Sequence, residues 1–215
     1  MLYYDHQFGN TRVAIWHVTE EYEELLGLLP DADSVSNEAT MRFTNEKRQI
    51  EWAAVRVLLY TMLGRQVHIS YNEQGAPMLP KYEGLNISIS HTRGYVAIAV
   101  SNTDVVGVDV EQIEQTSEGR MPKVERVKSK FIADDEYADT VIGLLLHWSA
   151  KESVYKVLGK EEVDFKEDLH IEPFDELCYE GQFTLTDKDD NTHNIIYKVF
   201  DEFVLTLTSK DERIR

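Results

Sequence analysis

The chain has 215 residues, of which 42% are hydrophobic and 28% charged, a mixture that suits one large or two small globular domains. Acidic residues outnumber basic ones by 39 to 22, and the resulting formal net charge of −17 disfavours general binding to nucleic acid. The single cysteine, Cys178, excludes an internal disulfide and a cysteine-based zinc site, which fits a reducing compartment. Residues 1–10 carry no basic or apolar leader, and no apolar run reaches membrane-spanning length, so we expect a cytoplasmic protein.

The first strongly patterned element is an amphipathic helix over residues 51–64, which contains Trp52 and ends at Gly64, a usual helix stop. A similar segment recurs over residues 147–159, with Trp148 in the place of the earlier tryptophan. The next element, residues 86–101, alternates as a β-hairpin does, and it recurs as residues 194–209.

Two matches in the same order favour an internal duplication, although chance resemblance between common elements is the alternative. The duplication predicts an α+β fold with two similar halves, residues 1–105 and 106–215, each a sheet packed on a long helix. Duplicated halves usually pack about a pseudo-two-fold axis, and a cleft along such an axis is a natural place for a ligand.

The segment over residues 105–111 reads as a buried strand on which Gly107, Asp109 and Glu111 share one face. Two neighbouring carboxylates repel each other unless a cation or a proton lies between them. We expect Gly107 to leave this face open for a ligand. Taken alone, such an acidic pair also occurs on solvated strand faces.

A basic run follows, from Arg120 to Lys130. As a helix, this run would place Lys123, Arg126 and Lys130 along one side. On an otherwise acidic protein such a side suits either a solvated helix face or a docking surface for an acidic partner.

The second tryptophan helix adds Glu152 and Lys156, which are four residues apart and share one helix face. One interpretation is a salt bridge within the helix. The other adds Glu152 to the two strand acids as a third hard oxygen ligand, a set that suits Mg²⁺, with Lys156 neutralising phosphate charge.

These motifs together resemble the signature of the 4′-phosphopantetheinyl transferases: Val-Gly-Val-Asp-Val-Glu over residues 106–111, then Trp-Ser-Ala-Lys-Glu-Ser over 148–153 and Lys156. The upstream strand over residues 86–91 and the Gly-Ala-Pro turn over 75–77 are similar to further family motifs. Length and two-half organisation resemble the larger, monomeric surfactin-synthetase-type group. The resemblance covers about residues 40–160.

The resemblance implies transfer of phosphopantetheine from coenzyme A to a serine of an apo acyl or peptidyl carrier protein, with release of 3′,5′-ADP. It implies that Asp109, Glu111 and Glu152 hold Mg²⁺, that Glu152 takes the serine proton directly or through water, and that Lys156 and Lys151 contact or orient phosphate. The expected coenzyme A contacts beside Lys156 are Arg48, Arg56, Gly75, Pro77, Ser90 and His91. Arg48 can equally be a surface arginine, and His91 a hairpin-turn histidine.

Two positions depart from the family pattern. Ala76 stands where the family turn has lysine, so one cationic contact to coenzyme A is either missing or supplied elsewhere. Val110 is a conservative change between the two acids. A non-catalytic protein that binds carrier proteins or coenzyme A is the alternative function, and the complete set of acids with Lys156 argues against it. Another Mg²⁺ phosphotransferase is more distant, because the chain has neither a phosphate-binding loop motif nor a kinase signature.

Overall fold

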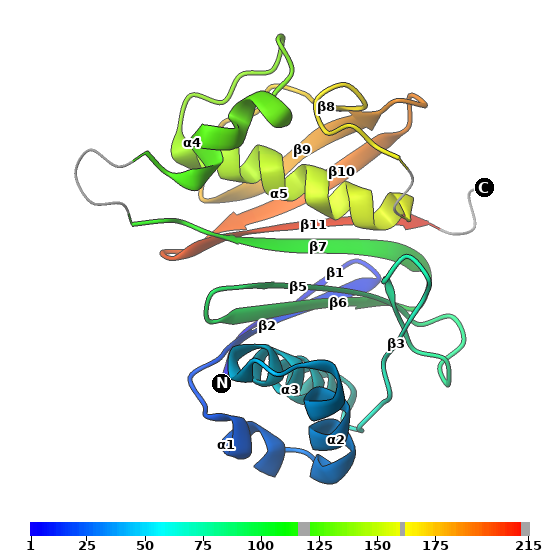
Figure 1. Ribbon diagram of the computed structural model, residues 1–215. Coiled ribbons are helices and arrows are strands. Elements are labelled where there is room, and N and C mark those ends of the chain that lie inside the picture. The colour runs from blue at the N-terminus through cyan, green and yellow to red at the C-terminus, as the bar shows by residue number, and fades with distance from the viewer. Residues whose placement is uncertain (116–120, 160–161, 212–215) are drawn as a thin grey trace. The chain divides into compact units, whose positions relative to one another are not determined.

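The computed structural model describes residues 1–115, 121–159 and 162–211, and its mixed helices and strands confirm the predicted α+β class (Figure 1). Contacts between residues divide the chain into two compact units, Met1–Thr103 and Asp104–Arg215. Each unit has its own sheet and its own hydrophobic core. Within the described ranges, no helix has the length and apolar character that crossing a membrane requires.

The first unit is a four-stranded antiparallel sheet in the order β1-β2-β6-β5, with helices packed against it. Its sheet strands are β1 (Leu2–Phe8), β2 (Thr11–His17), β5 (Asn86–Thr92) and β6 (Tyr95–Ser101). Its helices are α1 (Tyr22–Gly27), α2 (Ala32–Arg42) and α3 (Glu46–Leu63), and the short strands β3 (Ser70–Tyr71) and β4 (Pro77–Met78) pair separately.

Helix α3 confirms the predicted first tryptophan helix. It begins after Asn45, whose side chain accepts a hydrogen bond from the Arg48 backbone N–H, and it ends at Gly64, whose φ of 66° is a left-handed conformation that glycine adopts readily. Trp52 and Leu58 belong to the buried face of the helix, which packs on apolar residues of β2 and β6.

The second unit is a five-stranded antiparallel sheet in the order β7-β11-β10-β9-β8, with α5 packed on β7 and β11. Its strands are β7 (Asp104–Gln112), β8 (Leu169–Ile171), β9 (Glu180–Asp187), β10 (Thr192–Val199) and β11 (Phe203–Asp211). Its helical segments are α4 (Lys123–Val127), the 3₁₀ turn η1 (Lys128–Lys130) and α5 (Val141–Leu158).

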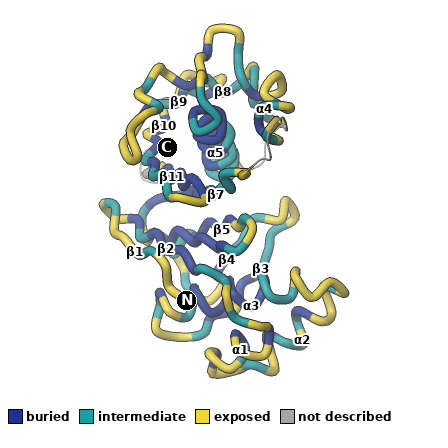
Figure 2. Tube along the Cα trace, turned by 90° about the vertical axis from the view of Figure 1, so that its left-hand side faces the viewer, coloured by how far each residue is buried: buried dark blue, intermediate teal, exposed yellow. Residues whose placement is uncertain are grey.

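Helix α5 is the central support of the second unit. Thr140 caps its N-terminus through a 2.8 Å hydrogen bond from the Gly143 backbone N–H, and Gly159 ends the helix with a φ of 75°. Ser149 and Ser153 both lie within hydrogen-bonding distance of the Thr206 hydroxyl on β11, at 2.9 and 2.7 Å. Every residue of α5 is buried or half-buried, and Figure 2, which views the helix nearly end on, shows it in these two colours.

The two units share one order of elements. In each, a strand (β2 or β7) is followed by helical segments that end in the long helix (α3 or α5), and then by a hairpin whose second strand pairs with the first strand. Both predicted hairpins, β5–β6 and β10–β11, are confirmed. This common connectivity is compatible with duplication, and the pseudo-two-fold relation stays a prediction.

Candidate active site

Helix α5 covers the face of β7 that carries the two predicted acids. Gly107 permits this approach, because a Cβ atom added there would collide with the backbone carbonyl oxygen of Ser153 on α5. The expectation that Gly107 keeps the face open for a ligand is therefore wrong. The missing side chain gives room to a helix, and the helix brings its own polar side chains to Asp109 and Glu111.

Three residues of α5, one helical turn apart, lie along the acidic strand. Trp148 donates its indole N–H to Glu111 Oε1 at 2.8 Å. Two turns later, Lys156 Nζ donates to Asp109 Oδ1 at 2.9 Å and to the Val108 carbonyl oxygen at 2.7 Å. Glu152 is one turn from each of these residues, so it belongs to the same face of the helix, between the two contacts. The structure thus brings Asp109, Glu111, Glu152 and Lys156 into one cluster, which we call the acidic cluster.

The pKa of Glu111 reflects its burial and the closeness of the other acids. Burial, with smaller contributions from the charges of Asp109 and Glu152, raises the pKa of Glu111 to about 7, against the lowering effects of the Trp148 hydrogen bond and of Lys123. Carboxylate oxygens are the donors that hard divalent cations prefer, and a cation would relieve this repulsion. The donor chemistry therefore fits Mg²⁺. Across the described residues, however, no three acidic, histidine or cysteine side chains already converge in a metal-binding arrangement.

The second predicted lysine of α5 lies elsewhere. Lys151 has a side chain that is 0% exposed, and its Nζ donates to Glu136 Oε2 at 2.7 Å and to the Phe131 carbonyl oxygen at 2.6 Å. The other oxygen of Glu136 accepts from the Ile171 backbone N–H at 2.7 Å. The structure does not bring Lys151 into the acidic cluster, and its internal contacts do not support the predicted phosphate contact. The pair instead ties residues 131–136 and β8 to α5.

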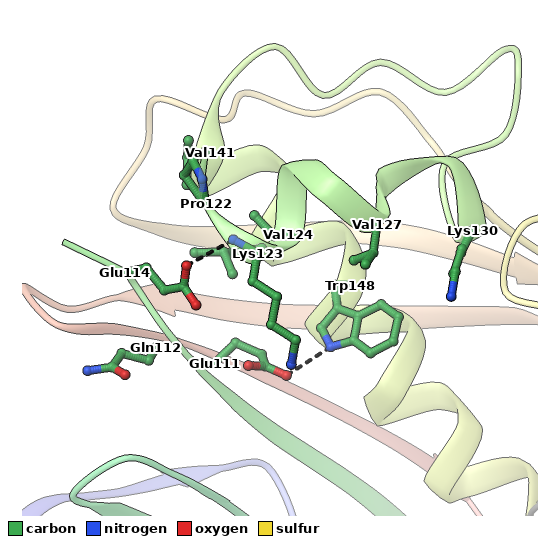
Figure 3. A pocket seen from close by; sticks show the side chains of 11 residues that line it. Glu111, Gln112, Glu114, Pro122, Lys123, Val124, Val127, Lys130, Val141 and Trp148 are labelled. Atoms are coloured by element: carbon green, nitrogen blue, oxygen red, sulfur yellow. Dashed lines mark hydrogen bonds between the residues drawn. The ribbon is translucent and has the colours of Figure 1, made fainter. Parts of the chain in front are cut away.

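A pocket of about 220 Å³ opens beside Glu111 and Trp148 (Figure 3). Apolar side chains of α4 and α5 form much of its wall: Val124, Val127, Val141 and Leu145. Lys123 and Lys130, at the two ends of the α4–η1 segment, also line it. The Lys123 side chain points toward Glu111, and its backbone N–H donates to Glu114 Oε2 at 2.9 Å.

The predicted basic helix face is only partly present. Helix α4 stops at Val127 and continues as a 3₁₀ turn, so Lys123 and Lys130 line the pocket, whereas Arg126 is not among its lining residues. Arg120, the first residue of the basic run, lies outside the described residues.

The predicted coenzyme A contacts of the first unit gather in a second pocket, of about 330 Å³, which we call the arginine pocket. Its lining includes five of the six residues predicted from this unit: Arg48, Arg56, Gly75, Pro77 and His91. Ser90 is not in the lining. Neighbouring residues of a strand point to opposite faces, so the side chains of Ser90 and His91 diverge.

Charged groups in the arginine pocket are partly paired. Glu51 lies 3.8 Å from Arg48 and 3.9 Å from His91. Arg56 is buried, with its guanidinium carbon 3.3 Å from the centre of the Trp52 ring. Burial lowers the pKa of Arg56, opposed by Tyr71 and by Glu38.

Three residues with clear positions escaped the sequence reasoning. The indole N–H of Trp148 holds a site carboxylate, a role that the pattern of the helix alone does not reveal. Glu136 lies in an acidic stretch that reads as surface, and only its spatial match to Lys151 reveals it. Arg42 lines the arginine pocket, and no local sequence motif marks it.

The comparison with known families agrees with this geometry. Residues 105–208 match the family described as the 4′-phosphopantetheinyl transferase superfamily, and this range contains every member of the acidic cluster. No curated protein matches the chain. The chain therefore contains a domain of the 4′-phosphopantetheinyl transferase superfamily, formed by residues 105–208.

Proposed function

We propose that the protein transfers 4′-phosphopantetheine from coenzyme A to a serine of an apo acyl or peptidyl carrier protein in an Mg²⁺-dependent reaction, as a cytoplasmic, monomeric enzyme of the holo-carrier-synthase type. The observation that supports it is the gathering of Asp109, Glu111, Glu152 and Lys156 inside the range that matches the superfamily. We also propose that the protein belongs to the surfactin-synthetase-type group of this superfamily, which its sequence resembles.

In this mechanism the serine hydroxyl attacks the phosphorus next to the pantetheine arm. A new P–O bond forms to the serine, the pyrophosphate P–O bond breaks, and 3′,5′-ADP leaves with the electron pair. Glu152 accepts the serine proton, directly or through water. Lys156, held beside Asp109, offsets the negative charge of the phosphates.

Asp109, Glu111 and Glu152 would hold the metal ion. When bound, Mg²⁺ supplies positive charge that stabilises the developing charge on the pyrophosphate oxygens. The nucleotide end of coenzyme A is assigned to the arginine pocket, with its Arg48, Arg56 and His91 side chains. Lys151 enters as a positioning residue, since its ammonium is buried against Glu136.

The carrier protein is assigned to the pocket beside Glu111. Carrier proteins of this superfamily are expected to be acidic near the modified serine, and an acidic helix with apolar side chains would meet Lys123 and Lys130 on either side of Val124 and Val127. Arg126, which does not line this pocket, is assigned a smaller contribution.

The test is direct. The protein is incubated with coenzyme A, Mg²⁺ and an apo carrier protein, and mass spectrometry follows the carrier. A mass increase of one phosphopantetheine on serine, with release of 3′,5′-ADP, is expected. Binding of both substrates without any transfer would instead favour the non-catalytic binding protein.

A further inference from the structure

In the second unit, the loop that leads from η1 into α5 lies beside the loop that joins β8 to β9. Two contacts hold the loops together. Near one end, Glu136 Oε1 accepts a hydrogen bond from the Ile171 backbone N–H at 2.7 Å. At the other end, Glu176 Oε2 accepts one from the Thr140 hydroxyl at 2.8 Å. The side chains that project outward between and next to these contacts therefore belong to one surface.

Three large apolar side chains on these loops are exposed. Tyr137 is 76% exposed, Leu177 79% and Tyr179 77%. Among the described residues, Met41 is the one large apolar residue that is more exposed than these three. Single exposed apolar residues are ordinary, whereas a group of them on one surface is typical of a protein-interaction site. We call Tyr137, Leu177 and Tyr179 the tyrosine patch.

Hydrogen bonds fix the turn that carries two members of the patch. Asp175 Oδ1 accepts from the Leu177 backbone N–H at 2.9 Å, and the Asp175 carbonyl oxygen accepts from the Tyr197 hydroxyl at 3.2 Å. The Tyr179 carbonyl oxygen accepts from the Val199 backbone N–H at 2.6 Å. Because the backbone already holds Leu177 and Tyr179 in place, a partner that binds them loses less free energy to the ordering of the loop.

The charges around the tyrosine patch have one sign. Residues 133–140 and 172–180 together contain eight acidic residues and no lysine, arginine or histidine. Two of the eight form the contacts between the loops. Three others have a cationic neighbour: Asp134, Asp135 and Glu180. The remaining acids, Asp139, Glu172 and Asp175, form no ion pair within the described part of the chain, so their charges are available to a cationic partner.

We propose that the tyrosine patch is a docking surface for a cationic polypeptide in which lysine or arginine side chains stand beside apolar ones. Its apolar side chains pack on the patch, and its cations pair with the three acids that have no cationic neighbour. The carrier protein is not this partner, because it is expected to be acidic and no residue of the patch lines the pocket assigned to it. The inference goes beyond the proposed function: the second unit has one cationic surface for the carrier protein and one acidic surface for a second protein.

Cys178 provides a reporter for the test, because it lies between Leu177 and Tyr179, is exposed, and is the single cysteine of the chain. Its alkylation by iodoacetamide is followed by mass spectrometry of the full-length protein. The probe is a synthetic amphipathic peptide of lysine and leucine, which should slow alkylation, and added salt should weaken this protection. A peptide with glutamate in place of lysine, or with serine in place of leucine, should protect Cys178 much less.

Matched variants separate the patch from the net charge of the protein. Leu177→Ser and Tyr137→Ser should each weaken binding of the labelled lysine–leucine peptide roughly tenfold, as expected for an interface anchor, when binding is measured by fluorescence anisotropy. Met41→Ser removes an equally exposed side chain of the first unit and should leave binding unchanged. The KM values for coenzyme A and for the carrier protein should stay the same in all three variants, and thermal unfolding establishes that each is folded.

Three results would overturn the inference and leave the proposed function standing. The first is equal peptide binding in Leu177→Ser and Met41→Ser. The second is protection of Cys178 that is absent, or that is as strong with serine in place of leucine, which would make the patch a solvated acidic surface. The third is a higher KM for the carrier protein in Leu177→Ser, which would assign the patch to the carrier protein instead.

Discussion

In the acidic cluster, two side chains of α5 contact the two carboxylates of β7: Trp148 contacts Glu111, and Lys156 contacts Asp109. Glu111 is half-buried next to two other carboxylates, and the pKa of its own carboxyl rises to about 7 as a result. The Trp148 hydrogen bond and the charge of Lys123 offset part of this cost at Glu111, while Lys156 forms an ion pair with Asp109. A divalent cation placed among the three acids would favour their ionised forms, which is why we expect the site to depend on metal.

Removing one acid should therefore remove the metal-dependent activity. Asp109→Ala and Glu152→Gln should each reduce the transfer rate by at least roughly 10²–10³-fold, the usual effect of losing one preorganised electrostatic group. Excess EDTA should abolish wild-type transfer and Mg²⁺ should restore it. Glu167→Gln, an exposed acid outside the cluster, is the control. Full activity of either site variant at saturating coenzyme A would rule out the assigned metal role.

The buried pair between Lys151 and Glu136 makes a second prediction at this scale, one of stability. Lys151→Met leaves the Glu136 carboxylate buried without its charged partner and should lower the free energy of unfolding by about 3–5 kcal/mol. Replacing both residues with apolar side chains should recover much of this loss. Urea unfolding measures each variant.

Lys166→Met is the control for that pair, because it removes the exposed ion pair with Asp134 and should barely change unfolding. If Lys151→Met were as stable as Lys166→Met, the pair would not support the fold as described. If Lys151→Met weakened coenzyme A binding without loss of stability, Lys151 would instead be a phosphate-binding residue, as the sequence resemblance implied.

At the scale of elements, the approach of α5 to β7 positions the acidic cluster. The sequence predicted both elements and their shared acidic face, because strand alternation and helical spacing are local patterns. It did not predict that Gly107 serves a helix, because that requires knowing which element packs on the strand. The same limit explains Glu136 and Arg42, whose partners lie far away in sequence or in another element.

Gly107→Ala tests this packing. The new methyl group would collide with the Ser153 carbonyl oxygen, so α5 must move away from β7, and overpacking of this kind usually costs about 1–3 kcal/mol. The shift should also separate Lys156 from Asp109. The transfer rate should therefore fall even at temperatures where the variant is still fully folded. Gly27→Ala is the control, because a Cβ atom there meets nothing within 4 Å. Identical thermal unfolding and kinetics in the two variants would contradict the close contact.

At the scale of the whole molecule, the net charge of −17 sets the problem of partner recognition. Two acidic proteins repel each other at long range, so an acidic carrier protein needs a local cationic surface to dock. The sequence located the basic run correctly but treated it as one continuous helix. The change from α4 to a 3₁₀ turn after Val127 divides the run, with Lys130 at the pocket and Arg126 outside its lining.

This division gives the docking prediction a matched pair of variants. Lys130→Glu and Arg126→Glu make the same change in net charge, so both alter long-range repulsion equally, and only Lys130→Glu changes the pocket lining. Steady-state kinetics at low salt should show a higher KM for the carrier protein in Lys130→Glu than in Arg126→Glu, with the KM for coenzyme A similar in both. Added salt should narrow the difference, because it screens exposed charges beyond about 8–10 Å. Equal carrier kinetics in the two variants at low salt would mean that the pocket beside Glu111 does not receive the carrier protein, and that the basic run acts only through net charge.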